Sequence, residues 1–145
     1  MKQSNKEIKL NHNAIDLYNI VLDIEKYPEY LPWCKKIEII EKNTNEIKAN
    51  MIVNYKIFPS QKFTSKVIYN IKNLSINTKY IEGPLKNLNT LWQFKKIQEN
   101  KCRVFFKVDF EFKNIFHQKF AELFFPLIEE KMMTSFIERA DQILD

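Results

Sequence analysis

The side chains that could support nucleophilic or metal chemistry are few and far apart in the chain. His12 and His117 are the two histidines and lie in different regions, and Cys34 and Cys102 form no Cys-x-x-Cys pair. No His-Glu-x-x-His spacing occurs either, so the sequence does not indicate a metal site. Cys34 with a distant histidine could form a nucleophile pair, but a small buried thiol is the simpler interpretation.

The carboxylates and the glycine offer little more chemistry. Asp109 and Glu111 are two residues apart on the polar side of an alternating segment, which is typical of a solvated strand face. Glu129 falls in an apolar helical stripe, where it either reaches solvent at the edge or serves as a buried acid. A single glycine, Gly83, cannot form a glycine-rich phosphate loop. These residues favour a binding protein over an enzyme.

The composition predicts one domain, residues 1–145, with a bulky core. The chain is 45% hydrophobic and 14% aromatic, and 12 of its residues are phenylalanine. Its net charge of +5 permits contact with an anionic surface, although lysine supplies nearly all of the positive charge. The chain shows no disulfide framework, signal-like segment or membrane-length apolar run. We therefore expect a cytoplasmic protein, or one peripheral to the inner face of the inner membrane.

Hydrophobic periodicity predicts an α+β fold. A helical pattern covers residues 14–24, with Asn13 as its cap and Pro28 ending it. The period then changes to two, which marks an antiparallel sheet with one buried face. The predicted strands are residues 36–42, 47–57, 61–71, 75–82, 88–98 and 103–113. A final helical segment covers 116–144, with a kink or break at Pro126, where its apolar stripe changes direction.

These elements predict a curved antiparallel sheet of about six strands wrapped around a long C-terminal helix. One helix cannot cover a twisted sheet of that size without leaving a gap. We therefore expect an apolar cavity between the helix and the sheet.

One connection is unusually apolar: residues 27–34 read YPEYLPWC, although connecting segments are generally polar. Together with three further segments, it makes the chain resemble the coenzyme Q-binding protein and ribosome-association toxin family of the START-like superfamily (helix-grip, polyketide cyclase/lipid transport). The segments that carry the resemblance are IVLDIEKYPEYLPWC at 20–34, GPLKNLNTLWQF at 83–94, VDFEFKNIFHQKFAELFF at 108–125 and SFIERA at 135–140. The resemblance covers nearly the whole chain and implies the same helix-grip fold.

The resemblance implies two alternative functions. One is a ubiquinone-binding carrier or chaperone that supports respiratory electron transport. The other is a toxin that binds the large ribosomal subunit and blocks subunit joining. The segment IFHQKFAELFF is more similar to the quinone branch, whereas Pro126 and Glu129 depart from the family pattern. We expect a monomeric, non-enzymatic quinone carrier with ubiquinone as its bound ligand and no other cofactor; a cyclase-type enzyme would need a buried acid, for which Glu129 is the candidate.

A quinone carrier needs an apolar tunnel, because exposing lipid to water costs roughly 0.8 kcal/mol per CH₂ group. The residues expected to line the tunnel are Val53, Tyr55, Phe63, Val67, Tyr80, Trp92, Phe94, Phe106, Val108, Phe110, Phe120, Phe124 and Met132. Tyr30, Tyr80 or Trp33 could donate a hydrogen bond to a quinone oxygen.

The YPEYLPWC segment is expected to form a stiff lip at the cavity mouth. Its Tyr30, Leu31 and Trp33 would close the pocket or enter the lipid interface. Replacement of Leu31 and Trp33 with Asp is then expected to weaken lipid uptake or membrane association and to leave the fold intact.

Overall fold

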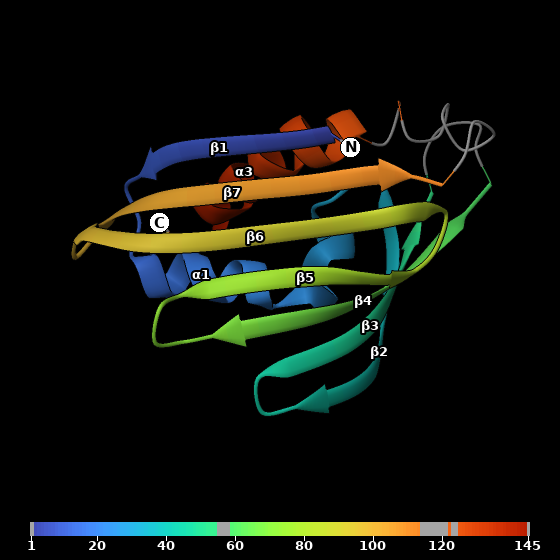
Figure 1. Ribbon diagram of the computed structural model, residues 1–145. Helices are drawn as coiled ribbons and strands as arrows, with labels where there is room; N and C mark the ends of the chain where they lie inside the picture. The colour runs from blue at the N-terminus through green and yellow to red at the C-terminus, as the bar shows by residue number, and fades with distance from the viewer. Residues whose placement is uncertain (1, 55–58, 114–121, 123–124, 145) are drawn as a thin grey trace.

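The computed structural model describes residues 2–54, 59–113, 122 and 125–144, and its strands form one antiparallel sheet (Figure 1). The strand order is β1-β7-β6-β5-β4-β3-β2. The strands are β1 (Lys2–Leu10), β2 (Cys34–Asn43), β3 (Glu46–Val53), β4 (Gln61–Asn70), β5 (Ser75–Glu82), β6 (Leu85–Gln98) and β7 (Lys101–Phe112). The helices are α1 (Ala14–Leu22), the 3-10 helix η1 (Ile24–Glu29), the π-helical turn η3 (Leu127–Lys131) and α3 (Met132–Ile143).

The α+β helix-grip class is confirmed, but the sheet has one strand more than the sequence predicted. The additional strand, β1, pairs along its whole length with β7, from Lys2 opposite Phe110 to Leu10 opposite Cys102. Its sequence KQSNKEIKL is polar except near its end, as is typical of an edge strand. A mostly polar strand shows little hydrophobic alternation, which is why the pattern did not reveal it.

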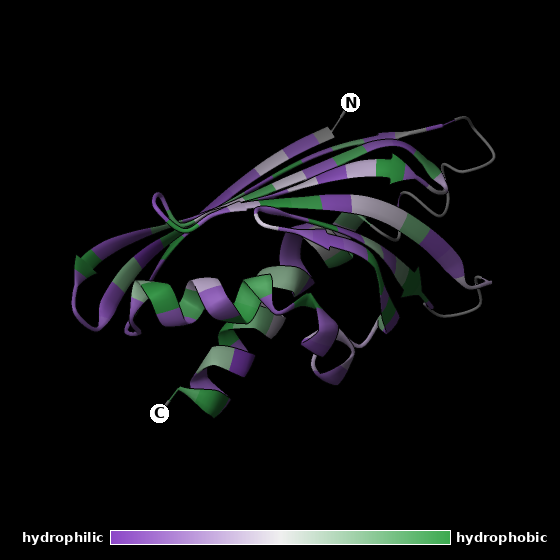
Figure 2. Ribbon diagram, turned by 90° about the horizontal axis from the view of Figure 1, so that it is seen from below, coloured by the Kyte–Doolittle hydropathy of each residue, from purple (hydrophilic) through white to green (hydrophobic). Residues whose placement is uncertain are grey.

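The chain crosses from one edge of the sheet to the other through α1 and η1, because β1 and β2 lie at opposite edges. Figure 2 shows the helices on one face of the sheet, which bends over them. Asn13 caps α1 as predicted, since its Oδ1 accepts from the N–H groups of Ile15 and Asp16 at 2.9 and 3.3 Å. Its Nδ2 also donates to the carbonyl of Glu99 at 3.0 Å, which ties the start of α1 to the β6–β7 turn.

A cluster of aromatic rings holds α3 on the concave face. The Trp92 ring of β6 lies 4.4 Å from Phe106 of β7 and 5.1 Å from Phe136 of α3, measured between ring centroids. Phe94 lies 6.2 Å from Phe136 and also from Tyr18 of α1. Aromatic side chains bury large areas and dominate core energetics, so this cluster joins both helices to β6 and β7.

The described part of the C-terminal helix is irregular next to Pro126, as the sequence predicted. A π-helical turn, η3, follows this proline directly and leads into α3. The predicted helical residues 116–121, 123 and 124 lie outside the described residues. On α3, Met133, Phe136 and Ala140 are buried, but Ile143, which was expected to continue the same stripe, is 50% exposed.

Three residues of the YPEYLPWC segment, Leu31, Trp33 and Cys34, belong to the core. Leu31 is 1% and Trp33 2% exposed, which contradicts an exposed lip that enters a membrane. Backbone hydrogen bonds hold both residues in place: Leu31 N–H donates to the Tyr27 carbonyl at 2.8 Å, and Asn54 N–H donates to the Trp33 carbonyl at 3.0 Å. The chain must pass beneath the sheet to reach β2, so this connection is covered and needs apolar side chains.

Because Leu31 and Trp33 are buried, replacing them with Asp is expected to destabilise the fold, and not to leave it intact as the sequence suggested. Leu31→Asp places a carboxylate in the core, and we expect it to lower the free energy of unfolding by at least about 3 kcal/mol or to prevent folding. Ile71→Asp is the matched control because Ile71 is 58% exposed, and we expect a change within about 0.5 kcal/mol. Urea denaturation followed by circular dichroism measures both, and similar midpoints for the two variants would place Leu31 outside the core.

Candidate ligand cavity

The inner face of β2–β5 and the helix η1 line a cavity of about 70 Å³. Its lining combines side chains from η1 with inward-facing side chains from four strands. The lining residues are Ile24, Tyr27, Ile37, Ala49, Met51, Phe63, Ser65, Val67 and Thr78. The cavity is thus one part of the space between sheet and helices that the fold was expected to leave.

Strand register places the strand residues of this lining on one face. Ala49 of β3 lies opposite Ser65 of β4, and Val67 of β4 lies opposite Thr78 of β5. Side chains of directly opposite residues in an antiparallel pair point to the same side, as do every second residue along each strand. The cavity roof is therefore a small patch of the concave face, built from cross-strand pairs.

The cavity lining carries no charged side chain, and it offers two hydroxyl groups. Within the part of the chain that the structure describes, the hydroxyls of Ser65 and Thr78 make no hydrogen bond to another residue. The Tyr27 hydroxyl donates to the Val21 carbonyl, and burial raises the pKa of Tyr27 well above its ordinary value, so Tyr27 stays neutral. An uncharged apolar lining disfavours an ionic ligand, since a buried charge needs a partner. The arrangement fits a neutral, mostly apolar molecule that accepts one or two hydrogen bonds.

Two residues of the tunnel predicted from the sequence, Phe63 and Val67, line this cavity. Tyr80 lies beside it, with its ring 6.1 Å from that of Phe63. Its hydroxyl donates to the Leu85 carbonyl and accepts from the Leu85 N–H, so it clamps the β5–β6 turn instead of offering a free donor.

The other predicted tunnel residues lie elsewhere. Met132 is half-buried on η3–α3, and Tyr55, Phe120 and Phe124 lie outside the described residues. The remainder are buried in the core and do not line this cavity: Val53, Trp92, Phe94, Phe106, Val108 and Phe110.

The sequence interpretation missed the two hydroxyl residues because it selected apolar and aromatic types. Ser65 stands between Phe63 and Val67 in the alternating pattern, so its inward position could have been read from spacing alone. The same alternation places Ala49 and Met51 on the inner side of β3 with Val53. No sequence signal placed η1 against β2–β4, since that contact depends on the crossover.

The candidate donors and acids of the sequence lie outside the cavity lining. The indole N–H of Trp33 is buried without an acceptor among the described residues. Glu129 is half-buried on η3, and Glu111 pairs with Lys86 at 3.5 Å on the outer face of the sheet. Among the described residues, no group of three or more His, Cys, Asp and Glu side chains could hold a metal ion, and no helix is long and apolar enough to cross a membrane.

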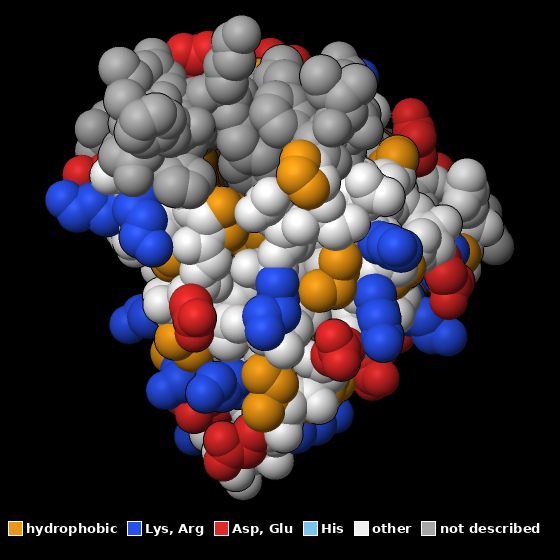
Figure 3. All heavy atoms as spheres, turned by 90° about the vertical axis from the view of Figure 1, so that its right-hand side faces the viewer, with side chains coloured by type: hydrophobic (Ala, Val, Ile, Leu, Met, Phe, Trp, Pro, Cys, Tyr) orange, Lys and Arg blue, Asp and Glu red, His pale blue; other side chains and the backbone are white. Residues whose placement is uncertain are grey.

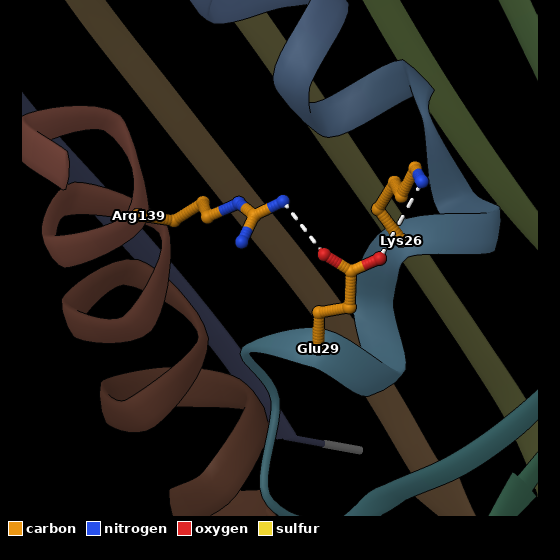
Figure 4. Close-up of polar contacts among 3 residues, drawn as sticks. All are labelled: Lys26, Glu29 and Arg139. Carbon is orange, nitrogen blue, oxygen red and sulfur yellow. Dashed lines mark hydrogen bonds and ion pairs between the residues drawn. The ribbon is translucent and has the colours of Figure 1, made fainter. Parts of the chain in front are cut away.

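An ion-pair cluster joins η1 to α3 (Figure 4). The Arg139 guanidinium donates to Glu29 Oε1 at 3.1 Å, and Lys26 Nζ lies 3.5 Å from Glu29 Oε2. The same guanidinium lies 5.2 Å from the centre of the Tyr30 ring, within range for a cation–π contact. The hydrogen bond from Arg139, and secondly the charge of Lys26, lower the pKa of Glu29 below its ordinary value.

A curved antiparallel sheet that bends over a C-terminal helix and encloses an apolar cavity defines the helix-grip class. The solved structure of the ZhuI aromatase/cyclase from a Streptomyces species has this fold: its TM-score is 0.84 over 99% of this chain and 96% of that chain, at 12% sequence identity.

Sequence comparison places the chain within this class. The family model "Polyketide cyclase / dehydrase and lipid transport" matches residues 10–137, and the chain belongs to that START-like family. The ribosome association toxin RatA of Rickettsia prowazekii is 31% identical over 131 residues, which cover 88% of each chain. The mitochondrial coenzyme Q-binding protein COQ10 of Drosophila melanogaster is 31% identical over 137 residues, which cover 92% of this chain and 56% of that protein.

The ion-pair cluster predicts a pH-dependent contribution to stability. Because the pKa of Glu29 is lower in the folded than in the unfolded protein, the contribution is present above the unfolded value of about 4.3 and is lost as the pH falls through the folded pKa. We expect Glu29→Gln to destabilise the protein more at neutral pH than near pH ~3. Urea unfolding at both pH values tests this, and a difference that does not change with pH would contradict it.

Proposed function

We propose that the protein binds the ring of a polyprenyl quinone in this cavity, with ubiquinone as the candidate ligand. The observation that carries the proposal is an uncharged apolar cavity with two hydroxyl groups free to donate. A quinone ring is neutral and flat and carries carbonyl oxygens that accept hydrogen bonds. The name of the Drosophila relative, a coenzyme Q-binding protein, supports the same ligand class.

The size of the cavity requires it to widen when the ring enters. A volume of about 70 Å³ is well below the roughly 300–1,000 Å³ of typical ligand sites. Met51 is a half-buried lining residue, and the flexible thioether side chain adapts readily to different neighbours. Movement of Met51 away from the cavity centre would provide space beneath Ser65 and Thr78.

A carrier role follows from the energetics of such a ligand. One isoprenoid unit of five carbons costs on the order of 3–4 kcal/mol to expose to water, so a polyprenyl quinone does not leave a bilayer unaided. A monomeric protein that shields the quinone beside a membrane would allow its use in respiratory electron transport. On this proposal the protein acts as a chaperone for the quinone, and no catalytic residue is needed.

Substitutions inside the cavity separate ligand binding from folding. Ala49→Leu should fill the cavity and abolish binding of an added ubiquinone analogue, with little loss of stability, because the added atoms enter space that is already empty. Thr78→Val should weaken binding about 3- to 10-fold, the equivalent of one hydrogen bond of roughly 1 kcal/mol. Quenching of tryptophan fluorescence by the quinone measures both affinities.

Thr64→Val is the matched control, since Thr64 lies on the outer face of β4 and its hydroxyl donates to Asn50 Oδ1 at 2.6 Å. It should leave quinone affinity unchanged. Extraction of the purified protein and mass spectrometry of bound lipid provide an independent test. A wild-type protein that carries no quinone and binds none when it is added would overturn the proposed function.

Association with the large ribosomal subunit is a second candidate, favoured by a row of lysines on the outer face. Lys48 of β3 lies opposite Lys66 of β4, which lies opposite Lys79 of β5. Like charges directly opposite one another destabilise a sheet, and a polyanion would relieve that repulsion. Glu46 offsets part of it through an ion pair with Lys66 at 3.5 Å. On the end of the molecule drawn in Figure 3, by contrast, positive and negative side chains are interspersed.

Replacement of this lysine row tests the second candidate. If the protein binds ribosomal RNA, wild type should sediment with large subunits at low salt, and changing Lys48, Lys66 and Lys79 to Gln should remove it from those fractions. The charge-matched control changes Lys9, Lys72 and Lys96 to Gln and should still sediment. Absence of the wild type from the large-subunit fractions, with unchanged 70S ribosomes on overexpression, would exclude this function.

A further inference from the structure

A second hollow, an open groove of about 320 Å³, lies beside the ligand cavity. It is bounded by the end of α1, the start of η1 and the inner face of β2–β4. The groove residues are Asn19, Leu22, Asp23, Ile24, Glu25, Ile39, Lys42, Ile47 and Tyr69. It is thus built from the same elements as the cavity, with α1 added.

The groove and the cavity are neighbours on the concave face and share one lining residue, Ile24. Ile24 lines both, so its side chain forms the wall between them. On the strands, groove residues occupy the next inward position after cavity residues: Ile47 is two residues from Ala49, and Tyr69 is two residues from Val67. A ligand that passes Ile24 therefore moves from the cavity into the groove without leaving the inner face of the sheet.

The groove has an apolar floor and a charged rim. Ile24 and Ile47 are buried in its floor, and Leu22 and Ile39 are half-buried beside them. The Tyr69 hydroxyl donates to the Asn43 carbonyl at 3.4 Å, so the floor offers no free donor there. Its charged members are Asp23, Glu25 and Lys42. The remaining donors of the lining, Asn19 and Lys42, are exposed. The buried apolar floor therefore suits a flexible hydrocarbon chain better than a polar ring.

We propose that this groove binds the hydrocarbon tail of the molecule whose ring occupies the cavity. The inference rests on the proposed function. It divides the site in two: the hydroxyl-bearing cavity binds the ring, and the open groove binds the first part of the tail. The cavity of about 70 Å³ must already widen for the ring and leaves no room for a tail, so the tail needs a second site, and the groove of about 320 Å³ lies within the range of ordinary ligand sites. Ile24 is the side chain that the ligand must displace or pass.

Two ligands that differ only in the tail provide the test. The tailless dimethoxy-methyl-benzoquinone and decylubiquinone would be titrated against wild type and Ile39→Gln, which places an amide on the groove wall. The matched control is Ile40→Gln, since Ile40 is the next residue of β2 and is 52% exposed. Circular dichroism melting of each variant establishes that it is folded.

We expect wild type to bind decylubiquinone more tightly than the tailless ring. Ile39→Gln should reduce the affinity for decylubiquinone roughly tenfold, about the loss of two buried CH₂ groups, while its affinity for the tailless ring stays the same. Equal affinities of the wild type for the two ligands, or equal losses for both in Ile39→Gln, would overturn the tail site and leave the ring site standing. Failure of wild type to bind either ligand would overturn the proposed function itself.

Discussion

The packing of Phe136 against Trp92 is the contact on which the internal space of this protein depends. It fixes α3 over β6 and β7, where the Trp92, Phe94 and Phe106 rings fill the volume between helix and sheet. A seven-stranded twisted sheet is too wide for one helix to cover completely, and α3 leaves the other half of the sheet uncovered. That half, β2–β5, is left to η1 and the end of α1, which cover it without filling it. The cavity and the groove are the result.

The crossover of the chain beneath the sheet explains why the connection YPEYLPWC at residues 27–34 is so apolar. Because β1 pairs with β7 at one edge and β2 forms the other edge, the connection between them must run along the concave face. This connection packs against β2 and contacts α3 through Glu29 and Tyr30, and its Leu31 and Trp33 are buried. The Arg139–Glu29 pair then joins the crossover to α3 at the surface, where an ion pair orients side chains more than it stabilises the fold.

The strands could be predicted well from the sequence because each has one buried and one solvent-exposed face, so apolar and polar residues alternate along it. The sequence revealed neither β1, whose residues are mostly polar, nor the 3-10 helix around Pro28, where the pattern predicted only the end of a helix. Alternation also assigned Trp92, Phe94 and Phe106 to the inner face correctly. The alternation could not show that α3 fills the space above these rings, because the position of α3 depends on tertiary packing between segments distant in sequence.

The ligand-facing residues were therefore the hardest to predict. Large aromatic residues were chosen as the tunnel, yet they are what packs most tightly against the helices. The open space lies where side chains are small or flexible, at Ala49, Ser65 and Met51. The position of a cavity depends on how distant elements pack, and neither residue type nor residue spacing indicates this directly.

The central claim is that a neutral ring enters the space beneath β3–β5. Methyl NMR of the full chain during titration with the tailless benzoquinone tests it most directly, because Ile24, Ala49, Met51 and Thr78 supply methyl groups to the cavity and Ile71 and Ile81 supply exposed references. We expect saturable shifts of the four cavity methyls with the two references unchanged. Shifts confined to the references, or none at saturating quinone, would contradict it.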